Sequence, residues 1–347
     1  MKQEKKGLSR RKFIGTTALV GAGIGLGGSR LFAGPALIKN PGYPASVISG
    51  VQIGVITYSF RSMPDQSAEA TLDYVKQCGI GAIELMGDPA ESFAGKPENP
   101  VDFRQYYRLR RAERDGGLSG DQQKELAELR EASEAYNKEV AAWREQTSME
   151  PFEELRRMYA NEGVSIYAFK PRAFGADNTE AEMDWGVRAA KALGASHITL
   201  EHPDNDSHTQ KLARIAAKHG IFVAYHGHEQ QTPTFWDTAL KQSTFNSLNL
   251  DLGHYVAAGN ADPLGIIRDK FYRIQSMHLK DRQKPENGKG NVVWGSGDTP
   301  IREALQLMRE NKYDFPGTIE LEYDIPEGSD AVAEVKKCLE FCREALS

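Results

Sequence analysis

The fold is decided by a stretch near the middle of the chain, residues 180–202, which reads EAEMDWGVRAAKALGASHITLEH. Glu180–Leu193 has the apolar spacing of an amphipathic helix, and Ser196–His202 is a short apolar and β-branched run typical of a buried strand. Gly194 lies between them, at the position where a helix C-cap favours glycine. The stretch therefore predicts a helix that leads directly into a strand, the repeating unit of an α/β fold.

The same unit recurs along the chain from residue 51. The predicted strands are, in order, Val51–Ser59, Ile80–Met86, Val164–Lys170, Ser196–His202, Ile221–His228, Ser247–Gly253, Ile274–Lys280 and Gly317–Tyr323. Each is followed by a helical pattern, and several helices end on a glycine. Eight consecutive βα units predict a closed parallel (β/α)8 barrel, a TIM barrel, over residues 51–347.

One segment interrupts this pattern. Residues 88–148 are highly charged and poor in apolar residues, with helical patterns at Phe103–Asp115 and Gly120–Trp143. The segment is a helical insertion between the second strand and its helix, so it leaves the barrel on the face where active sites of this fold lie. Two interpretations stay open: a lid over the mouth of the barrel, or a solvated hairpin without a role in the chemistry.

The N-terminus indicates export. Residues 9–14 read SRRKFI, and a glycine-rich apolar run follows from Gly15 to about Gly28. This pattern predicts a Tat-type signal peptide over residues 1–36, recognised by the Tat export machinery, and a periplasmic mature protein. The run is shorter than the roughly 20 residues that span a bilayer, which favours a removed peptide over an uncleaved membrane anchor.

Composition limits the class of partner. The chain has 347 residues, 40% hydrophobic content and a formal net charge of −5, so it can bury a large core but carries no broad basic field for nucleic acid. Its three cysteines lack metal-ligand spacing and are predicted to pack in the core. A small molecule is the expected partner.

Side chains that bind metals gather at the ends of the later strands. All eight histidines fall between His197 and His278, and five lie at or just past strand ends: His202, His226, His228, His254 and His278. Three consecutive strands bring Asp251, His278 and Glu322 to the mouth of the barrel. This set of nitrogen and oxygen donors predicts a divalent-metal site of the kind that suits Mn²⁺, Co²⁺ or Zn²⁺.

Two choices among the ligands depend on strand ends. Glu201 and His226, which end the fourth and fifth strands, compete for the place of fourth ligand. Glu320 and Glu322 share one face of the last strand, and Glu322 lies nearer the mouth. We therefore expect Glu322 to bind the metal and Glu320 to belong to a deeper structural layer, with Glu84 as a supporting carboxylate.

Further residues near the predicted mouth suit a sugar. Aromatic rings pack against sugar faces, and the candidates are Tyr58, Phe60, Trp236 and Trp294, although each also fits ordinary packing. His228 and His254 are candidates to contact substrate. Lys170 either binds an anionic or carbonyl group or is a solvated charge at the rim.

Four short motifs carry a resemblance to a known family. Tyr-His-Gly-His at 225–228, Asp-Leu-Gly-His at 251–254, His-Leu-Lys-Asp at 278–281 and Glu-Tyr-Asp at 322–324 follow one another on strands five to eight. In this order they resemble the xylose-isomerase-like sugar phosphate isomerase/epimerase superfamily, over about residues 51–347 apart from the insertion. The resemblance implies metal ligation by Asp251, His278 and Glu322, with Mg²⁺ also among the metals, and contacts of His254 and Lys280 with substrate oxygens.

The resemblance implies an isomerase or epimerase that acts on a keto-sugar or polyol. A metal would chelate a carbonyl and its neighbouring hydroxyl and stabilise an enediolate. Glu322, Glu201 and His226 are the candidate bases and acids, and Lys280 would hold a developing oxyanion. His226 stands where the ketose epimerases of this family have a glutamate. A lyase, dehydratase or hydrolase on a keto-sugar therefore stays an alternative, as does a periplasmic sugar-binding protein without turnover.

Overall fold

The computed structural model describes residues 46–347. The expected Tat-type signal at residues 1–36 lies outside this range. Within it, no helix combines the length and the apolar character needed to cross a membrane.

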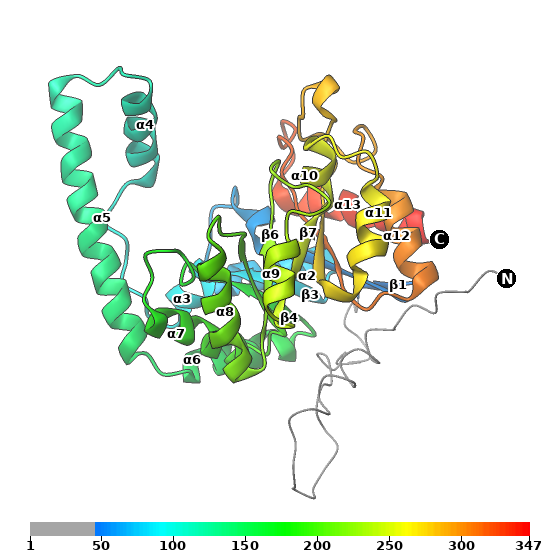
Figure 1. The fold of residues 1–347 in the computed structure, drawn as a ribbon, viewed down its shortest axis with the longest axis horizontal. Coiled ribbons are helices and arrows are strands. Elements are labelled where there is room, and N and C mark those ends of the chain that lie inside the picture. Colours follow the sequence, from blue (N-terminus) through cyan, green and yellow to red (C-terminus); the bar gives the residue numbers. More distant parts are fainter. Residues whose placement is uncertain (1–45) are drawn as a thin grey trace, which may run out of the picture.

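Eight parallel strands form a closed barrel, as the sequence predicts (Figure 1). Their bounds are β2 (Val51–Ile56), β3 (Ala82–Met86), β4 (Ser165–Lys170), β5 (His197–Glu201), β6 (Phe222–His226), β7 (Asn246–Asp251), β8 (Ile274–Leu279) and β9 (Gly317–Ile319). Neighbours in sequence are neighbours in the sheet, and β9 pairs with β2 to close it, for example through Ile319 and Val55. The short β1 (Val47–Ile48) pairs antiparallel with the start of β2.

Helices cover the outside of the barrel and bury its apolar face. They are α2 (Ala68–Cys78), α3 (Gly87–Phe93), α6 (Glu150–Asn161), α7 (Glu180–Ala192), α8 (Asp206–His219), α9 (Asp237–Gln242), α10 (Leu252–Ala257), α11 (Pro263–Lys270), α12 (Ile301–Asn311) and α13 (Ala331–Leu346). Gly79 and Gly220 end α2 and α8 with φ of 74° and 69°, the left-handed conformation that glycine adopts without strain. The three cysteines are buried and free, as predicted.

Most strands end a little earlier than the sequence indicates, and the first and the last do so by the largest margin. The first gives way to the 3-10 turn η2 (Thr57–Phe60), and the last ends at Ile319 instead of Tyr323. The backbone N–H of Glu320 still donates to the Leu279 carbonyl at 3.0 Å, and side chains replace the strand ladder from Leu321 on. The N–H of Leu321 donates to Ser59 Oγ at 3.0 Å, and its carbonyl accepts from Arg61 Nη1 at 2.6 Å. Residues 320–322 therefore already line the mouth of the barrel.

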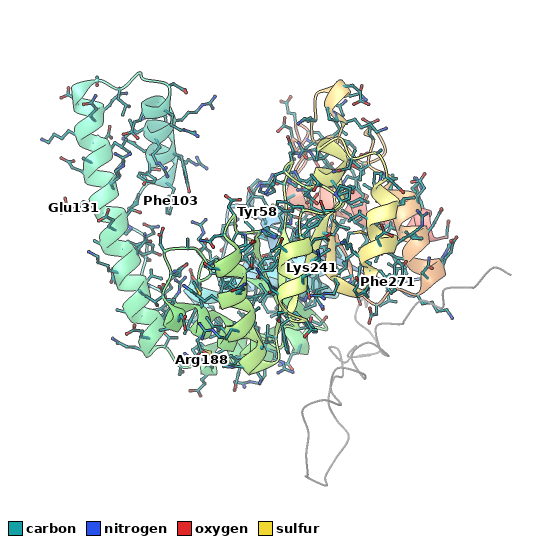
Figure 2. All side chains as sticks on the ribbon, viewed as in Figure 1. Tyr58, Phe103, Glu131, Arg188, Lys241 and Phe271 are labelled. Carbon is teal, nitrogen blue, oxygen red and sulfur yellow. The ribbon has the colours of Figure 1, made fainter. Side chains whose placement is uncertain are left out.

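The insertion forms a helical hairpin of α4 (Phe103–Arg114) and α5 (Gly120–Gln146), close to the predicted helices. The hairpin projects away from the barrel (Figure 1), and its side chains extend into the surroundings along most of its length (Figure 2). Its base is fixed by the buried Arg144, whose guanidinium lies 3.2 Å from Glu91 of α3 and 2.9 Å from Glu182 of α7. Whether the hairpin acts as a lid stays a prediction.

Candidate metal centre

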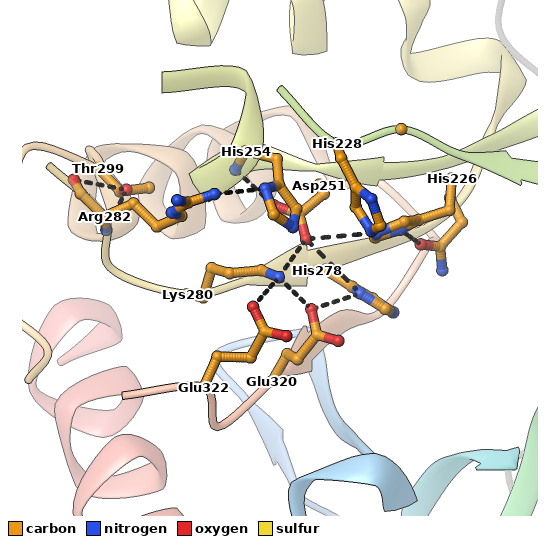
Figure 3. Close-up of polar contacts among 12 residues, drawn as sticks. His226, His228, Asp251, His254, His278, Lys280, Arg282, Thr299, Glu320 and Glu322 are labelled. Atoms are coloured by element: carbon orange, nitrogen blue, oxygen red, sulfur yellow. Dashed lines mark hydrogen bonds and ion pairs between the residues drawn. The ribbon is translucent and has the colours of Figure 1, made fainter. Parts of the chain in front are cut away.

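Four side chains meet inside the mouth of the barrel (Figure 3). His226 ends β6, Asp251 ends β7, His278 is the fifth residue of β8, and Glu320 directly follows β9. Because alternate residues of a strand face opposite sides, Asn249 shares the inward face of β7 with Asp251. The four side chains are buried, with at most 5% of each residue exposed.

The distances between their donor atoms suit one shared cation. Asp251 Oδ2 lies 3.9 Å from His226 Nε2 and 3.8 Å from His278 Nδ1, and His278 Nδ1 lies 3.0 Å from a Glu320 oxygen. Nitrogen and oxygen ligands at bonds of about 2.0–2.2 Å from one ion stand roughly 3–4 Å apart. Asp251 Oδ2 is buried and has no hydrogen-bond partner, although it forms an ion pair with the Lys280 ammonium at 3.0 Å. A bound cation would supply this oxygen with a ligand bond.

In His278 and His226, the ring nitrogen that points away from the other donor atoms lies within hydrogen-bond distance of an oxygen. His278 Nε2 lies 2.8 Å from a Glu84 oxygen, and His226 Nδ1 lies 2.8 Å from the Asn249 amide oxygen. Metal-binding histidines are oriented in this way, because a proton held on the outer nitrogen leaves the inner one free as a ligand. Asn249 was not singled out from the sequence. Its signal was its place two residues before Asp251, on the same face of the strand.

Lys280 adds a positive charge beside the carboxylates. Its ammonium lies 3.0 Å from Asp251 Oδ2 and 2.7 Å from one oxygen each of Glu320 and Glu322 (Figure 3). Burial lowers the pKa of Lys280, but the charges of Asp251 and Glu320 outweigh burial and raise it. Without a metal, this ammonium neutralises much of the negative charge at the mouth.

His278 carries a second positive charge in the metal-free site. Burial alone would lower the pKa of this imidazole, but the charges of Glu320 and Glu84 raise it to about 10. The carboxylates respond in opposite ways. Burial raises the pKa of Asp251, whereas Lys280 and His278 outweigh burial at Glu320 and hold its pKa well below the usual value.

The predicted ligands are not all brought together. Glu320, and not Glu322, contacts His278, because β9 ends at Ile319 and residue 320 already stands at the mouth. The side chain of Glu322 is 22% exposed and contacts Lys280. Of the two competitors for the fourth place, His226 lies beside Asp251.

Glu201 lies further out, with half of its side chain exposed. Its carboxylate is 3.1 Å from Lys170 Nζ and 3.4 Å from His228 Nε2. Lys170 is thus paired at the rim. Its pKa is raised because the nearby charges of Glu201 and Glu84 outweigh the effect of burial.

Three of the four aromatic residues predicted to meet a sugar do not reach the mouth. Phe60 and Trp236 are 1% and 0% exposed in the hydrophobic core, where Phe60 packs against Tyr74 of α2. Trp294 is also buried and packs edge-to-face against a ring of α13. The prediction that these three rings contact a sugar is therefore corrected: they pack in the core, where the helices cover their apolar surface. Tyr58 is 38% exposed, and the Arg61 guanidinium lies 4.5 Å from the centroid of its ring.

A second group of imidazoles lies further out. His226, His228 and His254 also place nitrogen atoms within 4.8 Å of one another. His254 is held by Arg282, which in turn lies 2.8 Å from Glu229. Burial and the charge of Lys280 lower the pKa of His254 to about 2, so its imidazole is neutral.

Comparison with known proteins agrees with the fold. The family model described as "Xylose isomerase-like TIM barrel" matches residues 72–345. No curated protein matches the chain. The D-psicose 3-epimerase of Clostridium cellulolyticum, solved with D-tagatose, is 13% identical with a TM-score of 0.55, over 86% of this chain and 100% of that one.

Two further structures are similar. The 3-keto-D-glucoside 4-epimerase of E. coli is 11% identical with a TM-score of 0.54, over 84% of this chain and 100% of that one. A xylose isomerase-like TIM barrel protein of Mycobacterium smegmatis in complex with magnesium is 16% identical with a TM-score of 0.51, over 85% and 96% of the two chains. At these identities the likeness establishes the fold. The family match over residues 72–345 shows that the chain belongs to the xylose isomerase-like TIM barrel family.

Proposed function

We propose that this chain is a divalent-metal-dependent isomerase or epimerase of a keto-sugar or related polyol. The observation that carries the proposal is the buried donor set of His226, Asp251, His278 and Glu320, in which Asp251 Oδ2 lacks a hydrogen bond. A cation bound by these residues would polarise a substrate carbonyl and its neighbouring hydroxyl and stabilise the enediolate formed on loss of the adjacent proton. The magnesium bound by the M. smegmatis relative supports a metal of this class.

Two carboxylates outside this donor set are the proposed acid and base. Glu201 ends β5 and Glu322 follows β9, which are the fourth and eighth strands of the barrel. In an eight-stranded barrel, these two strands lie on opposite sides. A substrate carbon between them can lose its proton to one carboxylate and gain a proton from the other on the opposite face, which inverts its configuration.

Neighbouring cations hold both carboxylates in place. Lys280 Nζ lies 2.7 Å from Glu322, and Lys170 Nζ lies 3.1 Å from Glu201. Charge-assisted contacts of this length fix the direction of a carboxylate. Tyr58, exposed at the mouth, is the aromatic surface proposed to cover a sugar face.

The proposal is tested by proton exchange. The purified mature protein, loaded with Mn²⁺ or Mg²⁺ and quantified for bound metal, is incubated in deuterated water with a panel of keto-hexoses and keto-glycosides. We expect deuterium at the carbon next to the carbonyl, followed by formation of the isomer or epimer. Glu201→Gln and Glu322→Gln should each retain the metal and lose epimerisation.

The other outcomes separate the alternative functions. Exchange accompanied by an unsaturated or cleaved product would replace the isomerase by a lyase. Metal and sugar binding without exchange would point to a binding protein without turnover. Absence of bound metal after loading would contradict the proposal altogether.

A further inference from the structure

His254 is positioned by the same carboxylate that lies at the centre of the proposed metal site. Asp251 caps α10, and its Oδ1 accepts the backbone N–H of His254 at 2.7 Å. The other oxygen of Asp251 faces His226 and His278. The position of the His254 ring relative to the donor set is therefore set by one short helical turn.

Arg282 determines which nitrogen of His254 carries the proton. A guanidinium nitrogen of Arg282 contacts His254 Nδ1 (Figure 3). Arginine has five N–H donors and no acceptor, so Nδ1 must be the acceptor in this contact and carry no proton. The neutral imidazole consequently holds its proton on Nε2.

Arg282 is itself fixed from two other sides. One of its guanidinium nitrogens donates to Glu229 at 2.8 Å and to the backbone carbonyl of Lys289 at 2.5 Å. The residue is 6% exposed, and its backbone N–H donates to Thr299 Oγ1 at 3.0 Å. A buried guanidinium held in this way cannot turn away from His254 without losing charged hydrogen bonds.

We propose that Arg282 is a positioning residue that fixes His254 in the Nε2–H form, so that His254 is a neutral hydrogen-bond donor to a substrate oxygen at the mouth of the barrel. The donor role rests on the proposed function. A neutral donor stabilises negative charge that develops on an oxygen without giving up its proton, as an oxyanion hole does.

The test is a measurement of the His254 tautomer by NMR. Long-range ¹H–¹⁵N spectra of the histidine-labelled mature protein are recorded near pH 7, with His254→Gln to assign the signal. We expect the Nε2–H form in the unaltered protein, a mixture of tautomers in Arg282→Met, and recovery of the Nε2–H form in Arg282→Lys, which is again only a donor. An Nδ1–H or doubly protonated His254 in the unaltered protein would overturn the proposal.

Arg302→Met is the matched control for Arg282→Met. It removes an exposed ion pair with Glu344 and should keep the Nε2–H form of His254. An unchanged Nε2–H form in Arg282→Met would show that Arg282 does not fix the tautomer. The NMR measurement needs no turnover, so failure of the sugar assay overturns the proposed function and leaves the tautomer result intact.

Discussion

Glu320 and Glu322 illustrate how two residues decide the site. Both contact Lys280, but only Glu320 contacts His278. Glu320→Gln should weaken metal binding by roughly 100-fold or more, because it removes the negative charge of a proposed ligand and not only a supporting contact. Its matched control, Glu322→Gln, should keep the metal and lose turnover. Calorimetric metal titration of both variants shows which glutamate is the metal ligand. Loss of the metal from Glu322→Gln alone would assign the ligand to Glu322.

The protonation of His278 leads to a prediction about pH. Against the effect of burial, Glu320 and Glu84 raise its pKa to about 10, so the metal-free imidazole is charged at neutral pH. Binding of a cation must displace this proton. Metal affinity should therefore rise from pH 6 to pH 9, with about one proton released per ion at pH 7, measured by calorimetry in buffers of different ionisation enthalpy. An affinity independent of pH would contradict this.

The same pKa shift acts on the stability of the metal-free protein. Because the folded pKa lies above the ordinary value of about 6.5, His278 contributes its full stabilisation below that pH. This stabilisation decreases as the pH rises above about 6.5 and is lost once the pH passes the folded pKa of about 10.

At the level of elements, the base of the hairpin is joined to the barrel by the buried charge of Arg144 and by packing of Trp143 against Trp185 of α7. Arg144 is 4% exposed and lies between Glu91 and Glu182, which would stay buried without it. Arg144→Ala should lower the free energy of unfolding by about 3–5 kcal/mol. Arg130→Ala, which removes an exposed pair with Glu113, should lower it by about 0–1 kcal/mol. Urea unfolding measures both, and equal effects would show that Arg144 does not anchor the hairpin.

The hairpin itself is expected to affect access of substrate and not the metal. The four proposed donors come from β6, β7, β8 and the residue after β9, and none comes from α4 or α5. Replacing residues 100–138 by a short glycine-serine linker, with Arg144 retained, should leave metal content and folding unchanged and alter KM or kcat for the sugar. Unaltered kinetics would favour the solvated hairpin over the lid.

For the whole molecule, the remaining expectation concerns where it acts. Arg10 and Arg11 precede the apolar run that predicts export. Changing both to lysine keeps the charge and should abolish appearance of the protein in the periplasm, and the exported chain should begin between about residues 30 and 40. Cell fractionation and N-terminal sequencing measure this. Export that survives the double change would contradict the Tat route.

The order of strands and helices is determined by short, local sequence patterns. Short β-branched runs, amphipathic segments and glycines such as Gly79 and Gly220 act on their own neighbours, so the eight βα units and the two insertion helices were predictable. Barrel closure follows from the number of units. The gathering of Asp251 and His278 at one mouth follows in turn, because parallel strands end at the same face.

Only the tertiary structure decided which residues share a site. The last strand ends at Ile319 because Ser59 and Arg61, about 260 positions away, take the hydrogen bonds of Leu321, and this places Glu320 beside His278. Arg282 meets His254 in the same way, through packing of two separate strand ends. Such contacts depend on depth and direction in three dimensions, which local propensity and spacing do not encode.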